Sequence, residues 1–159
     1  SEGPVSEQQI RDFAVKAYDI VSSMETTGSI SVISYSLGNG PAVYLASRDD
    51  VNIDMLILMA PYYSGYDLFN AQLNIFHGPL RLLVAYKMPV YRYAPDVTCP
   101  VTIIASTDDE VIPIESSRDL FGCFESASID FINVNGIGHN DFWSDPEVLS
   151  NLESILEER

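Results

Sequence analysis

Three side chains in separate segments of this 159-residue chain have the types needed for nucleophilic catalysis. Ser36 carries a hydroxyl, Asp109 a carboxylate and His139 an imidazole. In such a set the histidine takes the serine proton as the hydroxyl attacks a carbonyl carbon, and the carboxylate orients the imidazole and stabilises its charge. The chemistry therefore requires a fold that brings three distant segments together.

Ser36 lies in the sequence S-Y-S-L-G (34–38), between an expected strand and an expected helix. This is the setting of a nucleophile elbow, in which a sharp turn strains the serine backbone and small neighbours allow close packing. Gly38 is one small neighbour, and Ser34 stands where glycine is more usual. The Leu37 amide, at the helix start, is the expected oxyanion donor. Taken alone, the pattern is more often a helix cap.

The other two candidates lie in loops that follow later strands. Asp109 belongs to D-D-E-V-I-P (108–113), directly after an expected strand, where an orienting carboxylate belongs in an open α/β sheet. Taken alone, this segment is also typical of an acid cluster that caps a helix. His139 belongs to G-I-G-H-N-D (136–141), whose glycines favour a tight loop that presents the side chain. The second histidine, His77, matches no base position and is interpreted as structural.

The sequence around these loops alternates between helix and strand patterns. Apolar residues at helical spacing predict an amphipathic helix over 6–24, which begins with a capping box formed by Ser6 and Gln9. Apolar runs without alternation indicate strands buried on both faces. Strands are expected at 29–35, 55–60, 101–106 and 129–134, and further helices at 37–47, 115–125 and 145–158. This order predicts the α/β class, with a mostly parallel sheet flanked by helices on both faces.

Several segments resemble the small α/β-hydrolases. The opening S-E-G-P-V-S-E (1–7) is similar to the stretch after their fourth strand, and residues 34–38 to their elbow. Residues 99–113 resemble their acid loop, and the Gly-His pair at 138–139 resembles the glycine and final histidine of the family. The order serine, aspartate, histidine is also the order found in this family. The resemblance is strongest to serine aminopeptidase-like and lysophospholipase- or depalmitoylase-like members.

The resemblance implies a serine hydrolase without a metal or cofactor. Its catalytic residues would be Ser36, Asp109 (in preference to Asp108) and His139, with Leu37 as oxyanion donor. The expected reaction is hydrolysis of a carboxylic ester or thioester through an acyl-enzyme. Two alternatives stay open: a serine aminopeptidase, and a non-catalytic α/β-hydrolase-like module that acts in binding or assembly.

The resemblance also implies strands that this segment lacks. Members normally have four more strands before this point, and a loop among them supplies the second oxyanion donor. We therefore expect a single domain, 1–159, that is incomplete at its N-terminus. The strand at 29–35 would then be an open edge through which the chain self-associates.

The stretch from residue 61 to 98 interrupts the alternation and is rich in aromatic residues. A connection of this length is often functional. One interpretation is a helical cap over an apolar acyl pocket, with Tyr62, Tyr63 and Phe69 as lining residues. The other is a helical crossover whose aromatic side chains belong to the core.

Composition limits the partners. The chain has 23 acidic and 8 basic residues, a net charge of −15, which excludes non-specific binding to nucleic acid or anionic membranes. The aromatic residues of 61–98 favour a small-molecule substrate that is uncharged or carries an acyl chain, and the acidity disfavours an anionic one. Two cysteines and two histidines are too few for a disulfide framework or a structural metal centre. The cysteines favour a reducing compartment such as the cytoplasm.

Overall fold

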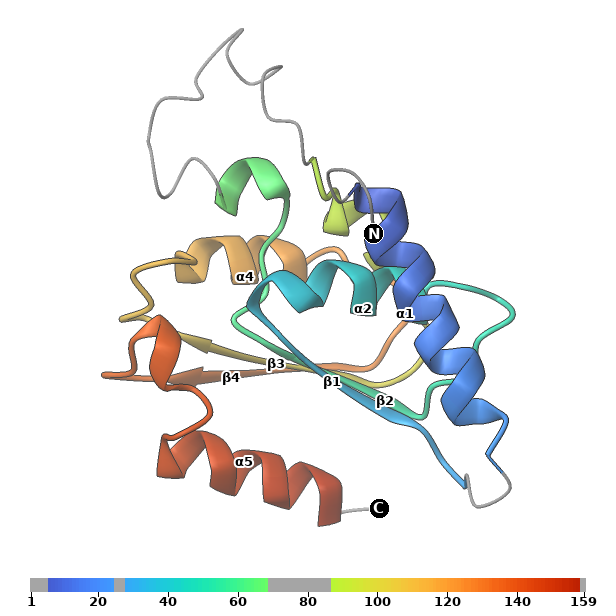
Figure 1. Cartoon of the computed structure of the whole chain (residues 1–159). Coiled ribbons are helices and arrows are strands. Elements are labelled where there is room, and N and C mark those ends of the chain that lie inside the picture. The colour runs from blue at the N-terminus through green and yellow to red at the C-terminus, as the bar shows by residue number, and fades with distance from the viewer. Residues whose placement is uncertain (1–5, 25–27, 69–86, 158–159) are drawn as a thin grey trace, which may run out of the picture.

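A computed structural model of the chain describes residues 6–24, 28–68 and 87–157, which are coloured in Figure 1. In this described part, four parallel strands form one sheet in the order β1-β2-β3-β4. The strands are β1 (Ser31–Tyr35), β2 (Met55–Met59), β3 (Val101–Ser106) and β4 (Ile129–Val134). Tyr35 pairs with Met59, and Ser106 pairs with Val134, so the loops that follow the strands emerge from the same edge. The predicted parallel sheet is confirmed.

Helices cover both faces of the sheet, as predicted. In Figure 1 the helices α1, α2 and α4 lie on one face and α5 lies on the other. Their bounds are α1 (Glu7–Ser22), α2 (Asn39–Ala46), α4 (Ile114–Phe121) and α5 (Pro146–Glu157). None of the helices in the described ranges is long and apolar enough to cross a membrane.

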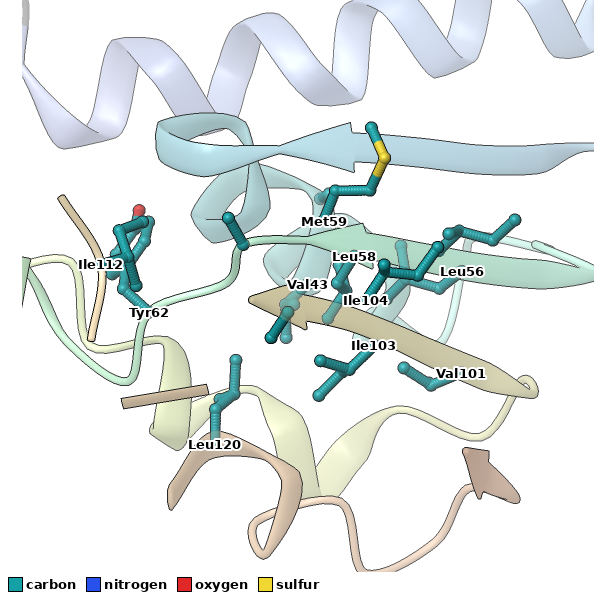
Figure 2. Close-up of a cluster of buried hydrophobic side chains, with 14 of the residues drawn as sticks. Val43, Leu56, Leu58, Met59, Tyr62, Val101, Ile103, Ile104, Ile112 and Leu120 are labelled. Atoms are coloured by element: carbon teal, nitrogen blue, oxygen red, sulfur yellow. The ribbon is translucent and has the colours of Figure 1, made fainter. Parts of the chain in front are cut away.

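The central strands form the middle of the core. Every residue of β2 and β3 is buried, because each strand has a neighbour on both sides and helices on both faces. Figure 2 shows side chains of these strands, such as Leu58 and Ile104, packed with Val43 of α2 and Leu120 of α4. Full burial of an aliphatic side chain of this size contributes about 1.5–3 kcal/mol. The core therefore fixes the strands whose carboxyl ends carry the candidate site.

The first helix begins as predicted but buries little. The Ser6 Oγ accepts a hydrogen bond from the Gln9 amide at 3.2 Å, and the Gln9 Oε1 accepts one from the Ser6 amide at 2.8 Å. Helix α1 packs against α2. It has no fully buried residue, and its outward side chains Phe13 and Ile20 are more than half exposed.

The segment 61–98 is described in two parts, 61–68 and 87–98. Residues 65–68 are helical, and short 3₁₀ turns lie at Val90–Arg92 and Ala94–Asp96. The centre of the expected cap, 69–86, lies outside the described residues, so the cap stays a prediction.

Strand β1 lies at one edge of the sheet in the part of the chain that the structure describes. Ile33 on this strand is 38% exposed, and β1 contains no charged residue or proline that would block pairing with another chain. We therefore expect the 159-residue chain to self-associate through β1. Ile33→Lys should shift the chain towards monomer, because it puts a charge on the edge.

Size-exclusion chromatography with light scattering measures this shift. Leu149→Lys is the matched control, since Leu149 is 39% exposed but lies on α5. A monomeric wild-type chain, or equal shifts in the two variants, would show that β1 is not the contact.

Candidate active site

Ser36 occupies the sharp turn that the sequence predicts. It follows the last residue of β1 and begins a 3₁₀ turn (Ser36–Gly38) that leads directly into α2. Its φ is +51°, in the left-handed region that a residue with a side chain rarely adopts. A backbone strained in this way costs about 1–3 kcal/mol and persists only where its surroundings hold it. The contacts around Ser36 show what holds it.

Hydrogen bonds from the Asn39 side chain stabilise this turn. Its fully buried side chain donates to the carbonyl oxygens of Ser36 at 2.8 Å and Met59 at 2.9 Å, which connects the turn to the end of β2. Its Oδ1 accepts a hydrogen bond from the Ser34 hydroxyl at 2.6 Å. Ser34 therefore replaces the usual glycine without leaving a buried hydroxyl unpaired. No pattern in the sequence indicates this role of Asn39, because its partners come together only in the folded chain.

The closest packing in this region occurs at Gly40 instead of Gly38. A Cβ on Gly40 would lie 2.5 Å from the Tyr62 hydroxyl oxygen, whereas a Cβ on Gly38 would meet no described atom within 4 Å. The Tyr62 hydroxyl also donates to the Leu37 carbonyl at 3.2 Å. Tyr62 thus supports the turn through its hydroxyl group.

This placement corrects the expectation for Tyr62. Its ring is fully buried among core residues and does not line an open acyl pocket. Tyr63 is partly buried and stacks on Tyr91, with ring centroids 4.6 Å apart. Phe69 and His77 lie outside the described residues.

Asp109 lies in the loop between β3 and α4, with its carboxylate almost fully buried. One oxygen, Oδ1, accepts the backbone amides of Val111 and Ile112, both at 2.8 Å. The other, Oδ2, lies 2.8 Å from Nδ1 of His139. Because its own loop fixes the carboxylate, Asp109 can orient the imidazole.

His139 connects the carboxylate to the serine. Its Nε2 lies 2.8 Å from the Ser36 Oγ, and its side chain is only 8% exposed. With a carboxylate at Nδ1, we assign the ring proton to that nitrogen and the Ser36 proton to the hydroxyl, which donates to Nε2. The fold therefore brings together Ser36, His139 and Asp109 in one hydrogen-bonded series, although about 100 residues separate the serine from the histidine.

Tyr35 is a second supporting residue of the site that no sequence pattern indicates. Its hydroxyl donates to the backbone carbonyl of His139, and its ring stacks on the imidazole with centroids 5.1 Å apart. Burial raises the pKa of Tyr35, and the nearby carboxylates of Asp109 and Glu110 raise it further. The hydroxyl therefore stays protonated and remains a donor.

Asp108 accepts its hydrogen bond from a different residue than Asp109 does. Its Oδ2 accepts the Gly136 amide at 2.7 Å, and this bond lowers the pKa of Asp108 below its ordinary value.

Leu37 lies in the first turn of the helical segment, where backbone amides have no acceptor within the helix. Within the described ranges, no three His, Cys, Asp or Glu side chains cluster as metal ligands.

No family model matches this chain. It is 29% identical over 159 residues to the α/β hydrolase domain-containing protein aho-3 of Caenorhabditis elegans, covering 99% of this chain and 45% of that protein. The chain thus spans less than half the length of that curated relative.

Solved structures extend the likeness to the fold. A Pyrococcus furiosus esterase matches with a TM-score of 0.76 at 14% identity, over 99% of this chain and 64% of its own. The chain has the α/β-hydrolase fold. A second similar structure is the Zea mays acyl-protein thioesterase 2, with a TM-score of 0.63 at 15% identity, over 98% of this chain and 69% of its own.

The two neighbouring aspartates of this chain should differ sharply in their effect on ester hydrolysis. Asp109→Asn removes the carboxylate that faces the imidazole and should lower kcat by about 10⁴-fold through the wrong tautomer. Asp108→Asn should cost less than about tenfold, because an exposed charge contributes only ~1 kcal/mol. Steady-state kinetics of both variants measure this difference. Equal losses, or a larger loss in Asp108→Asn, would show that the carboxylate role is assigned to the wrong residue.

Proposed function

We propose that this chain provides the nucleophile, base and orienting acid of a serine hydrolase that cleaves a carboxylic ester or thioester. The observation that carries the proposal is the unbroken series of hydrogen bonds from the Ser36 Oγ through His139 to Asp109, each 2.8 Å long. The left-handed backbone of Ser36 supports it, since strain of this kind concentrates at functional turns.

The first half of the reaction forms an acyl-enzyme. His139 Nε2 takes the Ser36 proton as Oγ attacks the carbonyl carbon, and Asp109 stabilises the imidazolium that results. The Leu37 amide donates to the negative oxygen of the tetrahedral intermediate. When the intermediate collapses, His139 returns the proton to the leaving alcohol or thiol, and the acyl group stays on Ser36.

The second half releases the acid. A water takes the place of the leaving group, and His139 accepts its proton as the water oxygen attacks the acyl carbon. Collapse of this second intermediate breaks the bond to Oγ, and His139 gives the proton back to Ser36. The chain is then restored, with one water consumed and one carboxylic acid formed.

One observation favours an ester or thioester over a peptide, and a second limits the charge of the substrate. The similar solved structures bear the names of an esterase and an acyl-protein thioesterase, although at this identity they carry the fold alone. The net charge of −15 disfavours anionic substrates. Tyr63 stays the proposed contact for the acyl chain, since it is partly buried on the connection that follows β2.

A fluorophosphonate probe tests the nucleophile. We expect it to label the wild-type chain at Ser36 and to give no label with Ser36→Ala, because Ser36 is the serine of the described ranges whose hydroxyl lies within hydrogen-bond distance of an imidazole. Ser31→Ala is the matched control, since Ser31 is an exposed serine of β1, the strand that precedes Ser36. Label that persists in Ser36→Ala would rule out this assignment, and a chain without label would favour the non-catalytic module.

The acyl-chain contact has its own test. Tyr63→Ala should change the ratio of kcat/KM between short and long p-nitrophenyl esters by more than about threefold, as expected for a few lost apolar contacts. Tyr63→Phe, which keeps the stacking on Tyr91, should leave the ratio close to wild type. If Tyr63→Ala unfolds the chain, or leaves the ratio unchanged, the tyrosine is a core residue.

A further inference from the structure

Three consecutive acidic residues of the loop after β3 each hold the loop after β4. Asp108 accepts the Gly136 amide at 2.7 Å, Asp109 binds the imidazole of His139, and Glu110 accepts the backbone amide of His139 through Oε2 at 2.9 Å. The two loops are therefore joined at three successive points. Only Asp109 among these acids has a role in the proposed chemistry.

Glu110 and Asp108 accept hydrogen bonds from different residues of the loop after β4. Its bond lies on the residue that carries the imidazole, whereas the bond of Asp108 lies three residues earlier. The Glu110 carboxylate can approach this backbone because residue 138 is glycine: a Cβ there would lie 3.3 Å from Glu110 Oε2 and 3.2 Å from Asp141 Oδ2. The bond from the His139 amide lowers the pKa of Glu110, so the exposed Glu110 side chain is ionised at neutral pH and accepts this bond as a carboxylate.

A second anchor is needed because one bond does not fix an imidazole. Asp109 holds the ring at Nδ1, but the ring can still turn about that contact if its backbone shifts. The backbone of His139 is held on both sides, its amide by Glu110 and its carbonyl by Tyr35. Together these contacts keep Nε2 at 2.8 Å from the Ser36 Oγ.

We propose that Glu110 is a positioning residue, whose bond to the His139 backbone holds the imidazole within proton-transfer distance of Ser36. This inference rests on the proposed function. A misplacement of about 1 Å in a catalytic group can cost about 10²-fold in rate. A bond that fixes the His139 backbone therefore affects the chemical step more than the binding of substrate.

The experiment compares Glu110→Ala with Asp108→Ala, which removes the same type of bond from Gly136. Glu110→Ala should lower kcat by about 10–100-fold with KM within about twofold of wild type, while the loss in Asp108→Ala is about tenfold smaller. Glu110→Gln should restore most of kcat, because its amide oxygen still accepts the His139 amide. Equal losses in the two alanine variants, or no recovery with Gln, would overturn the positioning role.

Gly138→Ala tests the same bond without removing Glu110, and it serves if Glu110→Ala fails to fold. Its Cβ should push the Glu110 carboxylate away from the His139 amide and lower kcat. In Glu110→Ala the same substitution should lower kcat by a smaller factor, because the Glu110 contact is already lost and the new Cβ crowds only Asp141 Oδ2. Independent, multiplying losses would contradict the proposal.

A proton NMR spectrum gives a readout that does not need turnover. The proton between His139 Nδ1 and Asp109 should give a downfield signal that is kept in Asp108→Ala and broadened or lost in Glu110→Ala. The same signal in both variants would contradict the positioning role. Turnover that survives Ser36→Ala would overturn the proposed function itself, whereas turnover that needs Ser36 but not Glu110 would overturn this inference alone.

Discussion

Parallel pairing of four strands is the constraint on which the candidate site depends. Because the strands of the described sheet run in one direction, the loops after β1, β3 and β4 leave from the same edge. Each loop brings one member of the Ser36, Asp109 and His139 series to that edge, and the buried apolar strands β2 and β3 keep the loops in place. Three residues far apart in the sequence thus meet within hydrogen-bond distance.

The loops themselves are held by polar contacts. Ser106 donates to the Ile137 carbonyl at 2.7 Å, and Asp108 and Glu110 accept amides from the same loop. Adjacent carboxylates repel one another, yet each is stabilised here by N–H groups that point at it. The pKa of both Asp108 and Glu110 is lowered chiefly by these backbone amides. The acidic cluster therefore links the loops after β3 and β4. From the sequence alone, this cluster is also typical of a helix cap.

Much of the fold was predictable because its signals are local. The strands at 101–106 and 129–134 have the predicted bounds, since apolar runs between turn residues need no distant partner to be recognised. The helix expected over 115–125 ends earlier, at Phe121, where Gly122 forms the cap. Strand β1 begins two residues late because the Ile30 amide bonds to the Asp54 side chain.

The supporting residues of the site were less predictable. The pattern around Ser36 indicated a turn, but not that Asn39 braces it or that Gly40 lies against Tyr62. An aromatic residue after a buried strand fits a pocket and a core equally well, and only packing places Tyr62 in the core. The contact between Tyr35 and the His139 carbonyl spans 104 residues, so no local pattern reports it.

The central claim is that Ser36 carries the acyl group during turnover, and rapid acid quenching tests it most directly. The chain is mixed with a p-nitrophenyl ester, quenched within the first turnover, digested with trypsin and analysed by mass spectrometry. The account predicts the added acyl mass on the peptide 17–48, localised by fragmentation to Ser36. Product release with the acyl group on Cys99 or Cys123, or with none on Ser36, would contradict it.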